Sequence, residues 1–121
     1  MAPVYVWQYP KCSTCRKALN WMTDRGVVFE AADIVTKPPA QAKLRELVRR
    51  SGLPIARFFN TSGVSYRAGG FRTRLMTMPE AEAIAALAAD GKLIKRPIVD
   101  TGTAVLVGFD EAAYRKELSR R

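Results

Sequence analysis

The chain has 121 residues, a formal net charge of +9, two cysteines and no histidine. Its length predicts a single domain, and the lack of histidine excludes Cys-His pairs and Ser-His triads. No apolar run reaches the ~18 residues of a membrane span, and the N-terminus lacks signal-peptide features, so we expect a cytoplasmic protein without a membrane partner. Lys and Arg are scattered among acidic residues, and we therefore do not expect direct nucleic-acid binding.

The first part of the chain predicts a β-α-β unit. Residues 4–9 (VYVWQY) are rich in β-branched and aromatic side chains, which is typical of a buried strand. A helical pattern begins at Ser13, and Gly26 is placed to end it. Residues 27–34 predict a second strand, which normally lies parallel to the first across a right-handed crossover. The predicted buried face of the helix consists of Cys15, Ala18, Leu19 and Met22.

The middle of the chain is predicted to be helical. Pro39 and Gly52 bracket one helix, and Pro79 and Gly91 bracket another, because proline suits a first helical turn and glycine suits the end. Between them, residues 53–75 predict only short helical turns and loops. The expected inward-facing residues of the two helices are Leu44, Leu47, Val48, Ile84, Leu87 and Ala88.

The last part of the chain predicts a β-hairpin followed by a helix. Residues 98–99 and 104–107 read as the two strands, and residues 100–103 have the composition of a turn. Asp110 is a suitable N-cap for a final helix over residues 111–121. The complete order predicts a mixed α/β fold: β-α-β, then helices, then β-β-α.

Both cysteines lie between the first strand and the first helix, two residues apart. Cys12 occupies the expected N-cap position, where free N–H groups and the helix dipole stabilise a thiolate. Lys11, Arg16 and Lys17 add positive charge nearby. Cys15 lies one turn further on the buried face, from which it could attack a mixed disulfide on Cys12. The pattern therefore predicts a nucleophilic thiol and a sheltered resolving thiol.

Two other interpretations of the cysteine pair remain open at this point. A zinc site would need two more ligands, and the chain has a single C-x-x-C pair and no histidine, so we expect no metal. Inert core cysteines are the second alternative, which fits Cys15 but not Cys12, because Cys12 directly follows the Pro10–Lys11 turn.

Pro97 stands directly before the first strand of the predicted hairpin. Proline lacks a backbone donor and is therefore placed at the first residue or the edge of a strand. In redox folds with this element order, a cis-proline at this point lies against the active cysteine, so we predict a cis Arg96–Pro97 bond. Arg96 could then bind an oxyanion through paired hydrogen bonds. The alternative for Arg96 is a surface salt bridge.

The chain resembles the arsenate reductase (ArsC) and Spx family of thioredoxin-like proteins in five segments that follow the family's order: YPKCSTCRKA, KPPAQAKLREL, FFNTSG, LAADGKLIKRPIV and VGFDEAAY. The resemblance implies one α/β thioredoxin-like domain over residues 1–121, with a helical insertion at about 38–90. It also implies a catalytic or redox cysteine at Cys12 and an oxyanion-binding arginine at Arg96.

Arsenate reductases of this kind attack arsenate with the cysteine, and glutathione with glutaredoxin regenerates it. They carry further arginines after the middle helix and in the last hairpin, near which this chain has Asn60 and Gly108. Arg67 is a candidate substitute. We assign catalysis to Cys12 and Cys15 and substrate or oxyanion binding to Ser13, Thr14, Arg96 and Pro97, with Lys11, Arg16, Asn60 and Arg67 as secondary candidates.

The C-x-x-C pair resembles the Spx branch of the family and its uncharacterised relatives. Spx proteins bind the C-terminal domain of the RNA polymerase α-subunit and use the dithiol as a redox switch. Two function classes therefore stay open: a thiol oxidoreductase and a redox-switched transcription partner. For the first we expect glutathione as co-substrate, with glutaredoxin or thioredoxin as protein partner, and no bound cofactor.

Overall fold

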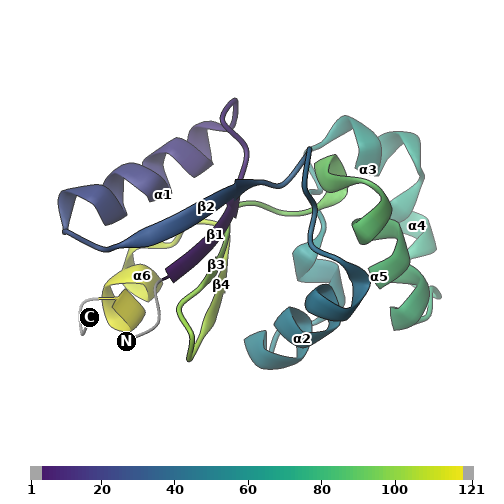
Figure 1. Cartoon of the computed structure of the whole chain (residues 1–121). Helices are drawn as coiled ribbons and strands as arrows, with labels where there is room; N and C mark the ends of the chain where they lie inside the picture. Colours follow the sequence, from purple (N-terminus) through teal and green to yellow (C-terminus); the bar gives the residue numbers. More distant parts are fainter. Residues whose placement is uncertain (1–3, 119–121) are drawn as a thin grey trace. The chain divides into compact units, whose positions relative to one another are not determined.

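The computed structural model describes residues 4–118, which divide into two compact units (Figure 1). The described part of the first unit comprises residues 4–33 and 96–118, and the second unit is Ile34–Lys95. The helical insertion expected at about 38–90 lies within the second unit. Both cysteines and Arg96–Pro97 belong to the first unit, which therefore carries the candidate chemistry.

The first unit is built on a four-stranded sheet with the order β2-β1-β3-β4. β1 and β2 are parallel, and the β1–β3 and β3–β4 pairs are antiparallel. This order is the thioredoxin-like α/β arrangement predicted from the sequence. The elements are β1 (Val4–Gln8), α1 (Ser13–Asp24), β2 (Phe29–Asp33), β3 (Ile98–Asp100), β4 (Val105–Val107) and α6 (Glu111–Leu118).

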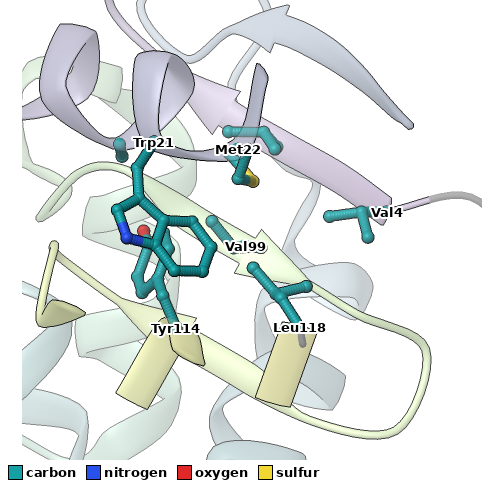
Figure 2. Close-up of a cluster of buried hydrophobic side chains, with 8 residues drawn as sticks. Val4, Trp21, Met22, Val99, Tyr114 and Leu118 are labelled. Carbon is teal, nitrogen blue, oxygen red and sulfur yellow. The ribbon is translucent and has the colours of Figure 1, made fainter. Parts of the chain in front are cut away.

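One face of this sheet packs against α1 and α6. A cluster of buried side chains forms the core between them (Figure 2). It consists of Val4 and Val6 of β1, Val99 of β3, Ala18, Trp21 and Met22 of α1, and Tyr114 and Leu118 of α6. The alternation along β1 sends Val4 and Val6 to the same side, which gives α1 a continuous apolar surface to cover. The predicted buried face of α1 is correct at Cys15, Ala18 and Met22. The prediction is wrong at Leu19, which is only partly buried, and it missed the buried Trp21.

The turn of the hairpin lies one residue later than predicted, at residues 101–104 instead of 100–103. Asp100 is the last residue of β3, and its Oδ1 accepts the Gly102 N–H at 2.9 Å. Thr101, which is buried, closes the turn by accepting the Ala104 N–H on its Oγ1 at 2.9 Å. The Asp100 backbone can therefore belong to the strand while the Asp100 side chain stabilises the turn that follows. Asp110 accepts the Ala112 N–H at 3.2 Å, as expected of an N-cap.

The second unit, Ile34–Lys95, is helical. One 3₁₀ turn and two short helices, within residues 55–74, occupy the segment for which the sequence predicted only short turns and loops. Gly52 ends α2 in the left-handed conformation, and Pro79 precedes α5, as predicted. Among the expected inward-facing residues, Ala88 is only half-buried and Ala83 takes its place. The elements are α2 (Gln41–Ser51), η1 (Ile55–Phe58), α3 (Val64–Ala68), α4 (Phe71–Arg74), α5 (Glu80–Ala89) and η2 (Gly91–Leu93).

None of the helices formed by residues 4–118 has the length and apolar character needed to cross a membrane. The last predicted helix ends at Leu118, and the part of that prediction covering residues 119–121 lies outside the described residues.

Candidate functional site

Cys12 is held at the start of α1 by its backbone and by its sulfur. β1 ends at Gln8, and the turn that follows closes when the Cys12 N–H donates to the Tyr9 carbonyl at 3.0 Å. The Cys12 carbonyl accepts the Arg16 N–H at 3.1 Å, and its Sγ accepts the Cys15 N–H at 3.3 Å. A thiol therefore takes the N-cap position that Ser, Thr, Asp or Asn usually occupies.

The environment of the partly exposed Cys12 thiol favours its charged form. Burial by itself raises the pKa of Cys12. Hydrogen bonds from the Cys15 thiol and N–H and from the Arg96 guanidinium outweigh that effect, and the Arg96 charge adds to them. The pKa of Cys12 consequently lies below its ordinary value, which makes the thiolate available nearer to neutral pH.

Cys15 has the opposite environment. It is fully buried, and its Sγ accepts the Tyr9 N–H at 3.4 Å. Burial, followed by the effect of the neighbouring Cys12, raises the pKa of Cys15 to about 12. Burial raises the pKa of Tyr114, and ionisation of the neighbouring Cys15 thiol would raise it further. In the reduced protein, Cys15 is thus a protonated thiol that donates to the Cys12 thiolate.

The structure brings Arg96 to the dithiol from the far end of the chain. The Arg96–Pro97 peptide bond is cis, which confirms that prediction. The half-buried Arg96 side chain hydrogen-bonds the Cys12 sulfur, and its Cζ lies 5.0 Å from the centroid of the Tyr9 ring. Pro97 is buried, and its carbonyl accepts the Gly108 N–H at 2.8 Å. The presentation of the Pro97 backbone to Cys12 stays a prediction.

The remaining candidates of the first unit surround the helix start. Ser13 and Thr14 are the first two residues of α1, and both are exposed. N–H groups at these positions have no intrahelical partner and are the kind of donors that bind an anion. Lys11 is exposed, and the Arg16 guanidinium donates to the Pro10 carbonyl at 3.1 Å, which ties this arginine to the preceding turn.

Asn60 and Arg67 lie in the other unit, Ile34–Lys95. The Asn60 N–H donates to the Leu93 carbonyl at 2.8 Å, and the Arg67 guanidinium donates to the Ser62 carbonyl at 2.9 Å. Both contacts are internal to that unit, and the substrate-binding roles assigned to these two residues stay predictions.

Tyr9 and Tyr114 contribute to the site and were not identified from the sequence. Tyr9 contacts both cysteines through its backbone and faces Arg96 with its ring. The buried Tyr114 hydroxyl donates to the Gly108 carbonyl at 2.7 Å, and Gly108 has a φ of 80°. The one available signal was the place of Tyr9 between the strand and the C-x-x-C turn, because residues there must lie beside the thiols.

Within residues 4–118 there is no group of three or more Cys, Asp or Glu side chains placed to hold a metal ion. The chemistry that these residues can support is that of two thiols, one arginine and the N–H groups at the start of a helix.

The ArsC family model matches residues 7–117, a stretch that contains the dithiol, Arg96 and Pro97. The chain belongs to the ArsC family. The uncharacterised protein YusI of Bacillus subtilis is 41% identical over 96% of this chain and 98% of its own length. The global transcriptional regulator Spx of Listeria monocytogenes is 22% identical over 98% of this chain and 88% of its own.

Two solved structures have closely similar folds. An ArsC family related protein from Bacteroides fragilis superimposes with a TM-score of 0.92 and 43% identity, covering 95% of this chain and 97% of its own. A protein described as a possible arsenate reductase from Streptococcus mutans has a TM-score of 0.84 and 41% identity, covering 90% and 92%. These likenesses support the thiol-based redox chemistry of the family for this chain.

Proposed function

We propose that this ArsC-family chain is a dithiol oxidoreductase in which Cys12 is the nucleophile and Cys15 the resolving thiol. The observation that carries the proposal is the hydrogen-bonded pair itself. One thiol is partly exposed and has a lowered pKa, and the other is buried, protonated and donates to the first. Such an asymmetric pair suits a two-step exchange, because only the exposed sulfur can be attacked or can attack from solution.

The reaction balances as a transfer of two electrons. The Cys12 thiolate attacks one sulfur of a substrate disulfide, the substrate S–S bond breaks, and one substrate thiolate leaves. Cys15 then loses its proton and attacks the Cys12 sulfur, which releases the second substrate thiolate and leaves a Cys12–Cys15 disulfide. Two glutathione thiols, or the dithiol of glutaredoxin or thioredoxin, would reduce the Cys12–Cys15 disulfide by the reverse exchange and would themselves be oxidised to a disulfide.

An oxyanion such as arsenate is the other substrate class that fits this site. Cys12 would displace hydroxide from arsenic, and attack by Cys15 on the Cys12 sulfur would reduce arsenic(V) to arsenic(III), again leaving the disulfide. Arg96 and the N–H groups of Ser13 and Thr14 would hold the anion. The description of the Streptococcus mutans relative as a possible arsenate reductase supports this choice of substrate class.

Mass spectrometry of the intact protein tests the proposal. Treatment of the wild type with diamide in the presence of glutathione should remove two hydrogens, and dithiothreitol should restore them. The Cys15→Ser variant should instead carry glutathione on Cys12 or form dimers. If the wild type gives only a glutathione adduct on Cys12 with Cys15 free, Cys15 is not the resolving thiol and a single-thiol mechanism is correct. Assays with arsenate, glutathione and glutaredoxin would then define the substrate.

A second function is favoured by the similarity to Spx across nearly the whole chain. In this alternative, the same dithiol controls binding to the C-terminal domain of the RNA polymerase α-subunit in the cytoplasm. A pull-down of purified α-subunit with the reduced and the oxidised protein distinguishes the oxidoreductase from the transcription partner. Capture that depends on oxidation, together with no turnover in the assays above, would replace the oxidoreductase proposal.

A further inference from the structure

Tyr9 contacts the dithiol with two backbone groups and Arg96 with its ring. Its carbonyl accepts the Cys12 N–H at 3.0 Å, and its N–H donates to the Cys15 Sγ at 3.4 Å. Its ring lies 5.0 Å from the Cζ of Arg96, within the range of a cation–π contact. The two backbone contacts would be available to any residue except proline. The aromatic ring is therefore the feature for which this position requires tyrosine or a similar side chain.

The ring has a specific partner to act on. Arg96 is a long side chain with many rotamers, and it must keep its guanidinium beside the Cys12 sulfur to stabilise the thiolate. A planar guanidinium stacks on an aromatic face, which restricts these rotamers and leaves the N–H groups at its edge free to donate. Arg96 is half-buried, so the contact is less screened than one on an open surface.

We propose that the Tyr9 ring is a positioning element that holds the Arg96 guanidinium against the Cys12 sulfur. The proposal deepens the proposed function, since it rests on Cys12 being the nucleophile that Arg96 serves. Tyr9 itself needs no contact with the substrate. Its ring acts through Arg96, while its backbone N–H and carbonyl hold the two cysteines independently of the side chain.

The Tyr9→Leu and Tyr9→Phe variants separate the ring from the backbone. Both keep the two backbone contacts, but only phenylalanine keeps an aromatic face. The rate of Cys12 alkylation by iodoacetamide, measured against pH and assigned by peptide mass mapping, gives the pKa of Cys12. We expect Tyr9→Leu to move the midpoint up by about half a pH unit and Tyr9→Phe to leave it near the wild-type value. Circular dichroism establishes that each variant is folded, and Tyr9→Met serves if Tyr9→Leu is not.

A double-mutant cycle decides whether the ring acts through Arg96. In an Arg96→Met background, Tyr9→Leu should produce no further shift, because the guanidinium that the ring holds is already gone. An equal shift in both backgrounds, or no shift in either, overturns the proposal. The measurement needs no substrate. A protein that fails the disulfide test but shows the coupled shift would refute the resolving role of Cys15 and leave the positioning role of Tyr9 standing.

Discussion

Replacing Cys15 with alanine should raise the pKa of Cys12. Burial raises the pKa of Cys12, and the hydrogen bonds to its sulfur lower it. The largest of the lowering effects is the hydrogen bond that the Cys15 thiol donates to the Cys12 sulfur. The Cys15 N–H, which also donates to Cys12, remains in the alanine variant. The change therefore removes one donor from the thiolate and leaves the helix start and Arg96 in place.

The size of the effect follows from the type of bond. A hydrogen bond to a charged group contributes about 1.5–3 kcal/mol, and S–H is a weak donor, so the lower end applies. At 1.36 kcal/mol per pKa unit, the pKa of Cys12 should rise by about one unit. Well below that pKa, the thiolate fraction falls about tenfold. Each remaining thiolate is more nucleophilic, with a Brønsted slope of about 0.4–0.5, so the alkylation rate should fall by about three- to fourfold.

The assay is the pH dependence of Cys12 alkylation between about pH 5 and 10, with Cys15→Ser as the matched control. Serine keeps a hydroxyl donor at the same place, so the pKa of Cys12 should stay near the wild-type value. A midpoint for Cys15→Ala equal to or below that of the wild type would refute the assignment of Cys15 as a donor. A similar rise in both variants would mean that the buried sulfur acts through packing rather than hydrogen bonding.

Three further changes test other parts of the structure. Arg96→Lys should weaken sulfate or arsenate binding about tenfold in a titration, because the two-pronged geometry is lost, and unchanged binding would rule out an oxyanion role. Tyr114→Phe should lower the free energy of unfolding in urea by about 1–3 kcal/mol, since a buried carbonyl loses its donor; an unaltered midpoint would contradict this. Gly91→Ala should lower the thermal midpoint more than Gly52→Ala. A Cβ at residue 91 would overlap the Ile34 carbonyl, whereas a Cβ at residue 52 meets open space and adds only the strain of a left-handed backbone.

The sequence alone was sufficient for the local arrangement of the dithiol. A strand, a turn containing proline and a helical apolar pattern place Cys12 at the N-cap and Cys15 one turn later on the buried face. Both placements depend only on the helical repeat and on capping, which act within a few residues. The parallel β1–β2 pair also followed, because a crossover through a helix permits few alternatives.

Only the tertiary structure decided what surrounds the two sulfurs. Arg96 reaches Cys12 because β3, which begins two residues after it, pairs with β1, the strand that leads into the cysteine turn. The Tyr9 ring faces Arg96 for the same reason. Segments far apart in the chain meet through sheet pairing, and neither hydrophobic periodicity nor capping records which side chains then become neighbours. The contribution of Arg96 to the lowered pKa of Cys12 is therefore a property of the fold, whereas the larger contributions of the Cys15 thiol and N–H come from the helical turn that the sequence predicts.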